Sequence, residues 1–455
     1  MADAADSKSA ARKGVRVRLP PPAPSPAATA SAAVDRRFRA RIEKLVYEGH
    51  GLARLEGRAM FVEGAAPGDL LDLRVTRLCS RHGWAEIVAV VEPSKYRLVP
   101  DCPVAGRCGG CTWLHVAPAA QLRAKEGIVR EALTPAGVEP ERIRPIIGME
   151  TPRFFRNKMS LSFGRDGGRP VCGLHERHCP ERVVSAAACL LQSPVSQEVV
   201  RRAETLIRRL SPCDWPVRLT IREGRATGER MIALRWGGRF RNPDLWRNAL
   251  GELSTTFLVA AGDGPFLAMT GDGRLREKLG GFLFDLGPED FFQTNTVQAD
   301  RLLAWVHVRA EARRPRQVLE LYAGTGAISP ALAAGGARVV TWESNRRSVE
   351  AARRNVAANG LDGIDVRCGE AERADLEGVD LVLVDPPRAG LSPAMRRRLA
   401  RCGAPAILYI SCNPATLGRD ARELASAGYR AVEIQPIDMF PHTHHIEVAV
   451  EFARG

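Results

Sequence analysis

The sequence predicts an α/β protein made of a small N-terminal β-barrel, a central α+β domain and a C-terminal open sheet covered by helices on both faces. Three observations predict this fold. Short strand-like runs broken by glycine and proline come before residue 93, a cysteine cluster lies in the middle of the chain, and apolar runs alternate with helical segments after residue 315. The predicted boundaries are 1–35 for an N-terminal arm, 36–93 for the barrel, 94–290 for the central domain and 291–455 for the C-terminal domain.

Composition narrows the class of protein. The 455 residues contain 66 Lys+Arg and 52 Asp+Glu, and the resulting net charge of +14 favours a polyanionic partner such as RNA; no DNA is expected. No apolar run reaches the roughly 20 residues that cross a bilayer, and no apolar segment precedes a cleavage site. A cytoplasmic protein that binds no membrane is therefore expected, and we expect a monomer. Eleven cysteines are too few for a disulfide scaffold and indicate metal binding or catalysis.

The N-terminal part contains an arm followed by the barrel. Residues 1–35 hold five prolines among alanine, serine and scattered charge, a composition that predicts disorder. The barrel is predicted from strand-like runs, which are 39–46, 58–62, 71–76 and 85–91. Barrels of this size often bind oligonucleotides, so the barrel is expected to contact RNA.

A cysteine cluster opens the central domain. Cys102, Cys108 and Cys111 have the spacing Cys-x5-Cys-x2-Cys, and three thiols within ten residues indicate a site for a soft metal. The candidates for a distant fourth ligand are Cys172, Cys179 and Cys189. Because zinc sites usually show two close pairs and only one Cys-x2-Cys is present, a cubane iron–sulfur cluster is the better match.

The C-terminal domain is predicted from strands that alternate with helices. The apolar strands are 318–322, 337–342, 380–384 and 406–410, and the clearest helix, 344–359, is closed by Gly360. Such alternation implies a mostly parallel sheet whose ligands bind at the carboxyl ends of the strands.

A glycine-containing loop at this edge predicts the cofactor. In Glu-Leu-Tyr-Ala-Gly-Thr-Gly, residues 320–326, Gly324 and Gly326 permit a tight turn and close approach of a ligand. Glu343 ends the next strand, where a carboxylate can bind ribose hydroxyls. The third glycine of dinucleotide loops and a phosphate-binding Lys-Ser/Thr pair are missing. A ligand with ribose but no phosphate, S-adenosylmethionine, is therefore favoured over a dehydrogenase cofactor or a purely structural turn.

Two further strand ends carry candidate catalytic groups. The rigid loop Asp385-Pro386-Pro387-Arg388 ends one strand, and Arg388 stands where amine-directed methyltransferases usually have an aromatic residue. Cys412 follows the next strand at the same edge, where a thiolate suits nucleophilic attack better than structural packing. Glu447 follows three histidines that could instead bind a metal, namely His442, His444 and His445.

A thiol and a carboxylate together indicate one reaction. Carbon 5 of uracil is too weak a nucleophile to take a methyl group unaided. Attack of Cys412 on carbon 6 would generate an enolate at carbon 5, and after methylation Glu447 would remove the carbon-5 proton so that the thiolate leaves. The target base must first be flipped out of its stack to reach Cys412.

In combination these residues resemble the bacterial uracil-carbon-5 RNA methyltransferase family, in particular its enzymes for large-subunit (23S) ribosomal RNA. The resemblance covers about residues 38–453. It implies a Rossmann-like class I methyltransferase domain. Through Gly49-His50-Gly51 and Pro67-Gly68-Asp69 it also implies that the barrel is an OB-like, RNA-binding TRAM domain.

The resemblance further implies roles for single residues. In the family, the clustered cysteines and one later cysteine hold a [4Fe–4S] cluster, and the preceding segment 182–184 selects Cys189 as the later one. The segment 155–158, Phe-Arg-Asn-Lys, resembles an RNA-contacting stretch, and 291–295, Phe-Phe-Gln-Thr-Asn, resembles a cofactor-contacting motif. The implied S-adenosylmethionine ligands are Gln293, Tyr322, Glu343 and Asp385, with Glu370 near the adenine. Cys412 matches the family nucleophile and Glu447 its base, whereas Glu320 and Ala323 replace the commoner Asp and Cys.

Relatives that act on transfer RNA typically lack both barrel and cluster, so ribosomal RNA is the predicted substrate. Some cluster-bearing relatives methylate transfer RNA, which remains an alternative, and the motifs do not identify the modified uridine. A cytosine-carbon-5 methyltransferase would usually carry a cysteine directly after Pro-Pro, where this chain has Arg388. A non-catalytic RNA-binding protein is disfavoured by the presence of Cys412 and Glu447.

Overall fold

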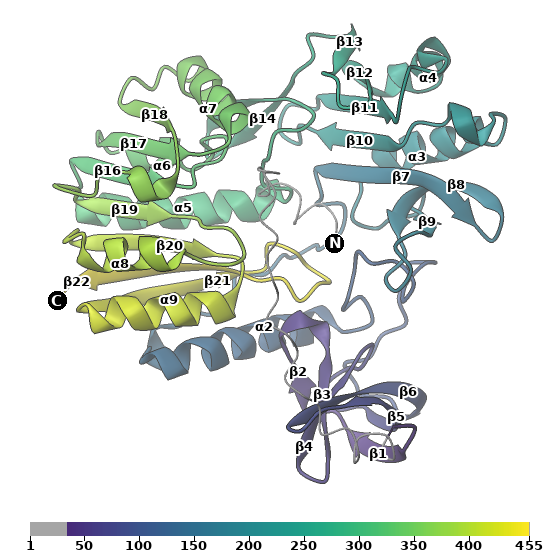
Figure 1. Ribbon diagram of the computed structural model, residues 1–455, viewed down its shortest axis with the longest axis horizontal. Helices are drawn as coiled ribbons and strands as arrows, with labels where there is room; N and C mark the ends of the chain where they lie inside the picture. Colours follow the sequence, from purple (N-terminus) through teal and green to yellow (C-terminus); the bar gives the residue numbers. More distant parts are fainter. Residues whose placement is uncertain (1–33, 455) are drawn as a thin grey trace.

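The computed structural model describes residues 34–454, which form a barrel, a central sheet, a two-stranded hairpin and a C-terminal sheet (Figure 1). The barrel is drawn in purple, the central sheet in teal, and the C-terminal sheet in green and yellow. The predicted arm, residues 1–35, falls almost entirely outside the described residues. No helix among the described residues has the length and apolar character needed to cross a lipid bilayer.

Six strands form the barrel, in the order β1-β5-β6-β4-β3-β2. They are β1 (Arg37–Arg41), β2 (Lys44–Leu45), β3 (Gly51–Leu55), β4 (Arg58–Val62), β5 (Leu70–Leu78) and β6 (His82–Glu92). Along β5 the side chains of Leu71, Leu73 and Val75 are fully buried and alternate with partly exposed residues, so one face of the strand builds the barrel core. The predicted strand 58–62 is confirmed, and the run 39–46 is divided into β1 and β2.

A buried ion pair joins the barrel to the segment that follows it. Arg97 donates to Asp69 at 2.6 Å, and the backbone N–H groups of Ala66 and Ser94 donate to the same carboxylate. Burial alone would raise the pKa of Asp69, but these donors outweigh it and lower the pKa. The Asp69 carboxylate therefore stays charged, and its hydrogen bonds fix the position of the chain where it leaves the barrel.

The central sheet has seven strands in the order β13-β12-β11-β10-β7-β8-β9. They are β7 (Lys158–Asp166), β8 (Arg169–His175), β9 (Val183–Ser185), β10 (Arg218–Glu223), β11 (Arg230–Trp236), β12 (Thr256–Ala261) and β13 (Leu267–Thr270). Helices α3 (Pro194–Ile207) and α4 (Pro243–Leu250) pack on this sheet around a core that contains Trp236, Trp246 and Phe257. A hairpin, β14 (Leu275–Leu279) and β15 (Phe282–Leu286), leads to the C-terminal sheet.

The C-terminal sheet has the order β18-β17-β16-β19-β20-β22-β21. Its strands are β16 (Gln317–Leu321), β17 (Arg338–Glu343), β18 (Ile364–Cys368), β19 (Leu381–Val384), β20 (Ala406–Ser411), β21 (Tyr429–Ile437) and β22 (Glu447–Arg454). Its helices are α5 (Thr296–Arg313), α6 (Ser329–Ala333), α7 (Arg346–Ala358), α8 (Pro393–Arg401) and α9 (Pro414–Ser426). The first five strands in that order pair in parallel, and β22 pairs antiparallel with β20 and β21.

Neighbouring residues of β16 point into different cores, as expected for a sheet covered on both faces. Val318 belongs to a core shared with α5, α6 and α7, whereas Leu319 belongs to a core shared with α8 and α9. The predicted α/β class, with an open and mostly parallel C-terminal sheet, is confirmed.

Helix α2 (Pro118–Leu133) precedes the central sheet in the chain but packs against α9 of the C-terminal sheet. Its fully buried Lys125 forms an ion pair with Asp438 at 2.5 Å and also donates to the carbonyl of Phe440 at 3.1 Å. Because an unpaired buried cation is costly, these contacts fix the segment that leads from β21 to β22.

Candidate active site

A cavity of about 290 Å³ opens at the carboxyl ends of β16, β17 and β19. Six predicted cofactor residues line it, namely Gln293, Tyr322, Gly324, Glu343, Glu370 and Asp385. Gly326 is not among the lining residues: a side chain there would meet Ala352 at 3.2 Å, so this glycine serves helix packing. The lining also includes Phe291, from the predicted cofactor-contacting segment 291–295, and Asn345 and Ser348, which sequence reasoning did not single out. For Asn345 and Ser348, the only indication in the sequence was their position at the start of the predicted helix.

The loop after β16 turns sharply to form one wall of this cavity. Tyr322 has a φ of +64° and Gly324 a φ of +58°, both in the left-handed region. A non-glycine residue there stores strain, which is typical of ligand sites. The hydroxyl of Thr325 donates to the carbonyl of Phe291 at 3.0 Å and ties the turn to the opposite wall.

Two predicted motifs far apart in the chain are bound to each other. The side-chain amide of Asn157 donates to the carbonyl of Gln293 at 2.9 Å and to the hydroxyl of Thr296 at 2.8 Å, and its backbone N–H donates to the carbonyl of Thr294. The Phe-Arg-Asn-Lys segment therefore holds the backbone of the Phe-Phe-Gln-Thr-Asn segment, which places Gln293 at the cavity.

The carboxylate of Glu343 is held in place by the backbone. The N–H of Gly324 donates to Oε2 at 3.0 Å and the N–H of Asn345 donates to Oε1 at 2.7 Å. Each oxygen retains a lone pair that can accept a further hydrogen bond from a ligand.

We expect Glu343→Gln to weaken binding of S-adenosylhomocysteine about 10- to 100-fold, because hydrogen bonds to a charged group are worth roughly 1.5–3 kcal/mol. Isothermal titration calorimetry measures the dissociation constant. The matched control is Glu350→Gln, on the exposed side of α7, which should bind as the wild type does. Equal affinity of the Glu343 variant and the wild type would contradict a ligand role.

A second carboxyl at this cavity is neutral. Glu320 is fully buried, and its pKa is raised to about 8, mainly by burial; the hydrogen bond from Ser329 opposes this shift, and the charges of Asp385 and Glu343 contribute to it. Because the Glu320 carboxyl is protonated, it adds no negative charge to the cavity. Sequence reasoning placed Glu320 at the start of the predicted cofactor loop and noted its departure from the family pattern, but did not include it among the cofactor ligands.

Cys412 and Glu447 lie at neighbouring positions at the end of one antiparallel ladder. Cys412 directly follows β20 and Glu447 is the first residue of β22. The last paired residues of these two strands are Ser411 and Val448, so the next position on each strand is Cys412 and Glu447. Paired positions of such a ladder have Cα atoms roughly 5 Å apart. The register therefore brings the two predicted catalytic residues to the same sheet edge.

The Asp385-Pro386-Pro387-Arg388 loop is bound to the cysteine's neighbour. The side-chain amide of Asn413 donates to the carbonyl of Arg388 at 3.1 Å, and the Asn413 side chain also caps helix α9. Because Asp385 and Pro387 line the cofactor cavity, the loop connects that cavity to Cys412.

The barrel also reaches this edge, which sequence reasoning did not predict. Arg388 donates to the hydroxyl of Tyr47 at 3.3 Å, and its guanidinium lies 6.0 Å from the Tyr47 ring centroid. Burial raises the pKa of Tyr47, Arg388 opposes the shift, and the nearby Cys412 adds to it. Tyr47 belongs to the turn between β2 and β3, so a barrel side chain is next to the predicted nucleophile.

The three histidines before Glu447 make packing and hydrogen-bonding contacts. His442 is hydrogen-bonded to the carbonyl of Pro152 at 2.8 Å, and the rings of His444 and His445 lie 4.2 Å apart. Burial lowers the pKa of His444 to about 4 and of His445 to about 3, so both are neutral near pH 7. These contacts indicate a structural role for the cluster.

The four cysteines predicted as cluster ligands surround one cavity of about 380 Å³, and they are Cys102, Cys108, Cys111 and Cys189. The backbone N–H of Gly110 donates to Sγ of Cys108 at 3.4 Å. The other candidates lie elsewhere: Cys172 is buried in the core of the central sheet, and Cys179 contacts Glu181. Within residues 34–454, no group of three His, Cys, Asp or Glu side chains is arranged to hold a metal ion.

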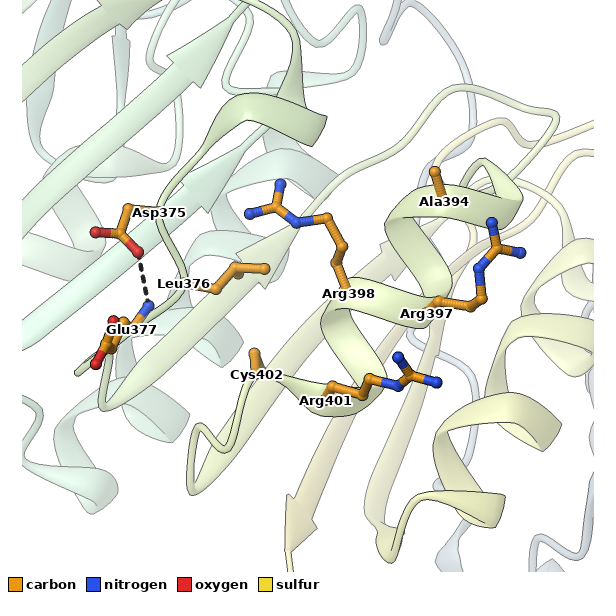
Figure 2. Close-up of a pocket in the computed structure, with 8 residues that line it drawn as sticks. All are labelled: Asp375, Leu376, Glu377, Ala394, Arg397, Arg398, Arg401 and Cys402. Carbon is orange, nitrogen blue, oxygen red and sulfur yellow. Dashed lines mark hydrogen bonds between the residues drawn. The ribbon is translucent and has the colours of Figure 1, made fainter.

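Another cavity, of about 590 Å³, contains none of the predicted site residues (Figure 2). It lies between α8 and residues 375–377, the segment that precedes β19 in the chain. Figure 2 shows Arg397, Arg398 and Arg401 of α8 on one side and Asp375 and Glu377 on the other. Arg398 donates to two backbone carbonyls of the facing segment, so it stabilises the fold at this edge.

Comparisons with known proteins agree with this geometry. Residues 281–454 match the tRNA (uracil-5-)-methyltransferase family, and residues 33–88 match the TRAM domain. An uncharacterized RNA methyltransferase of Gloeobacter violaceus is 35% identical over 443 residues, covering 91% of this chain and 96% of the relative. Another uncharacterized RNA methyltransferase, from Thermosynechococcus vestitus, is 33% identical over 437 residues, covering 90% of this chain and 96% of the relative.

A solved structure extends the similarity to three dimensions. The Pyrococcus abyssi tRNA (uracil-54, C5)-methyltransferase in complex with S-adenosyl-L-homocysteine superposes with a TM-score of 0.74 at 28% identity, covering 91% of this chain and 100% of that one. The TRAM barrel and the methyltransferase fold predicted from the sequence are thereby confirmed. The chain belongs to the family of S-adenosylmethionine-dependent RNA (uracil-5-)-methyltransferases.

Proposed function

We propose that this protein methylates carbon 5 of a uridine in RNA through a covalent adduct on Cys412. The observation that carries the proposal is the register of β20 and β22, which places Cys412 and Glu447 at neighbouring positions beside the loop that lines the cofactor cavity. A nucleophile and a base at one edge, next to a cavity with a ribose-binding carboxylate, suit this reaction better than binding alone.

The chain's own residues supply the covalent steps. The Cys412 sulfur adds to carbon 6 of the flipped uracil, and the electron pair of the carbon 5–carbon 6 bond moves toward carbon 5 and the carbonyl oxygen. S-adenosylmethionine, when bound, provides the methyl group that carbon 5 takes up. Glu447 then removes the carbon-5 proton, the double bond forms again, and the Cys412 thiolate leaves.

RNA in which 5-fluorouracil replaces uracil tests this proposal. A base can remove a proton from carbon 5 but cannot remove fluorine, so the Cys412 adduct cannot be resolved. The enzyme should therefore become trapped as a covalent complex that survives denaturing electrophoresis. Complex formation should require S-adenosylmethionine. The absence of any complex with substrate RNA would mean that the reaction does not pass through a cysteine adduct.

We propose large-subunit ribosomal RNA as the substrate and assign a separate function to each domain. Residues 36–93 and 94–290 would bind RNA, and residues 291–455 would transfer the methyl group. Transfer RNA is the second candidate because the Pyrococcus abyssi relative is a tRNA (uracil-54, C5)-methyltransferase. Mapping 5-methyluridine in ribosomal and transfer RNA from cells with and without the gene separates the two substrates.

We further propose that Cys102, Cys108, Cys111 and Cys189 hold a [4Fe–4S] cluster. The four thiols line one cavity, and a cubane takes one thiolate at each of four irons, which holds the ligands farther apart than a single ion does. The site would join the loop before α2 to the segment after β9 and so stabilise the central domain.

Cys189→Ala should remove the visible absorbance of protein purified without oxygen and lower its iron content. Cys179→Ala is the matched control and should stay brown, because Cys179 does not line the cavity. Colourless wild-type protein that contains zinc would contradict the cluster, and loss of colour in the Cys179 variant would assign the fourth ligand differently.

A further inference from the structure

The outer face of the barrel carries aromatic side chains where the strand pattern predicts polar ones. In β4 and β6, Phe61 and Trp84 alternate with buried residues and are partly exposed. The two strands pair in parallel with Phe61 opposite Trp84, so the two side chains lie side by side on one face. His82, two residues before Trp84, shares this face. Aromatic rings grouped on a surface mark an interaction site.

The rings are close enough to act as one surface. The centroids of Phe61 and Trp84 are 5.9 Å apart, and that of His82 lies 4.8 Å from Trp84 and 5.8 Å from Phe61. Together with His50, whose ring centroid lies 6.2 Å from that of Phe61, the three rings form a row along the barrel surface. The guanidinium of Arg77 lies 4.7 Å from the Trp84 ring centroid at the outer end.

The inner end of this row reaches the catalytic edge. His50 follows the turn that contains Tyr47, whose ring centroid lies 5.7 Å from that of His444. Tyr47 also accepts the hydrogen bond from Arg388, whose carbonyl is bound by the residue next to Cys412. The row therefore runs from the outside of the barrel to the predicted nucleophile.

The charge around the row suits a nucleic acid. Arg77 and Arg81 are exposed at its outer end. Two carboxylates lie beside the row: Glu48, which is exposed next to Tyr47, and Glu63, which forms an ion pair with Arg177 at 2.5 Å and lies 3.0 Å from the His178 ring. Rings beside cations bind single-stranded nucleic acids, because bases stack on the rings and phosphates pair with the cations. Duplex RNA does not fit, since its bases are already stacked inside the helix.

We propose that Tyr47, His50, Phe61, His82 and Trp84 form an aromatic track that stacks the unpaired bases next to the target uridine and leads the strand from the barrel to Cys412. This inference rests on the proposed function in one respect, namely that the target uridine lies at the end of the track beside Cys412. The track makes a single-stranded or locally melted segment the form of RNA that the enzyme recognises.

The test is the affinity of the full-length protein for a labelled 12-nucleotide single strand with one uridine, measured by fluorescence anisotropy without S-adenosylmethionine. Trp84→Ala should bind about tenfold more weakly, because stacking of one base on an aromatic side chain contributes about that factor. Trp84→Phe should restore binding to within about threefold, since phenylalanine keeps a ring. Phe61→Ala should behave as Trp84→Ala does.

Three controls separate stacking from other causes. Val90→Ala, at an exposed position of the same strand, should leave the affinity unchanged. The duplex form of the RNA should bind all variants equally. The dependence of log Kd on log salt should keep its slope in Trp84→Ala, because a lost stacking contact releases no counterions. Thermal melting by circular dichroism verifies that the Trp84 variants are folded.

Wild-type affinity of Trp84→Ala for the single strand would overturn the track, and so would an equal loss for the duplex or a failure of Trp84→Phe to restore binding. These outcomes are independent of catalysis. A wild-type protein whose binding follows this pattern but which methylates no uridine would instead overturn the proposed function.

Discussion

Replacing Cys412 with alanine is expected to abolish methyl transfer while RNA binding survives. Without the thiolate, carbon 5 of uracil never becomes nucleophilic, so the methyl-transfer rate should fall by about 10⁴-fold or more, as for other removed nucleophiles. Transfer of tritiated methyl groups from S-adenosylmethionine to RNA measures the rate, and fluorescence anisotropy measures binding. The affinity for RNA should remain within about twofold of wild type, since a small thiol adds little to an extended RNA interface.

Cys213→Ala is the matched control for this experiment. Cys213 is exposed and lies in the central domain, away from the C-terminal sheet, so its replacement should change neither rate nor affinity. Equal loss of binding and turnover in the Cys412 variant would mean that Cys412 supports the fold instead of attacking the base. A fully active Cys412 variant would assign the nucleophile to another residue.

Replacing Glu447 with glutamine should leave the reaction stalled after methylation. Glutamine keeps the size of the side chain but cannot accept the carbon-5 proton, so the thiolate cannot be expelled. The methylated RNA should accumulate as a covalent complex with the protein, and its release should slow by about 10²- to 10⁴-fold. Denaturing electrophoresis shows the complex, and mass spectrometry shows the added methyl group.

Glu451→Gln provides a control on the same strand. Glu447 and Glu451 are similarly buried, at 5% and 3% exposed. Glu451 forms an ion pair with Arg313 and lies away from the Cys412 end of the ladder. The control should release product at the wild-type rate. Rapid release by the Glu447 variant would show that another group removes the proton.

Much of the cofactor site could be predicted because it depends on strand order alone. Glu343 and Asp385 each follow or end a parallel strand, and the carboxyl ends of such strands meet at one sheet edge. The sequence pattern therefore places both at one cavity before any side-chain packing is known. The same reasoning places Cys412 at this edge, because β20 is parallel to β19.

The remaining features depend on contacts between distant segments. Tyr47 lies 341 residues before Arg388 in the chain, and only the packing of the barrel against the catalytic edge joins them. The packing of helix α2 against α9 was not predicted, because the sequence pattern of a helix does not identify the partner of its apolar face. The neutral state of Glu320 follows from complete burial, which the local sequence does not reveal.

The position of β22 has a consequence for how the enzyme is synthesised. This strand follows β21 in the chain yet lies between β20 and β21 in the sheet, so it must insert between two strands made earlier. On the ribosome, Cys412 therefore emerges well before Glu447. Cys412 and Glu447 therefore reach neighbouring positions only when this insertion completes the sheet, so the proposed nucleophile and base can act together only after the last strand has been made.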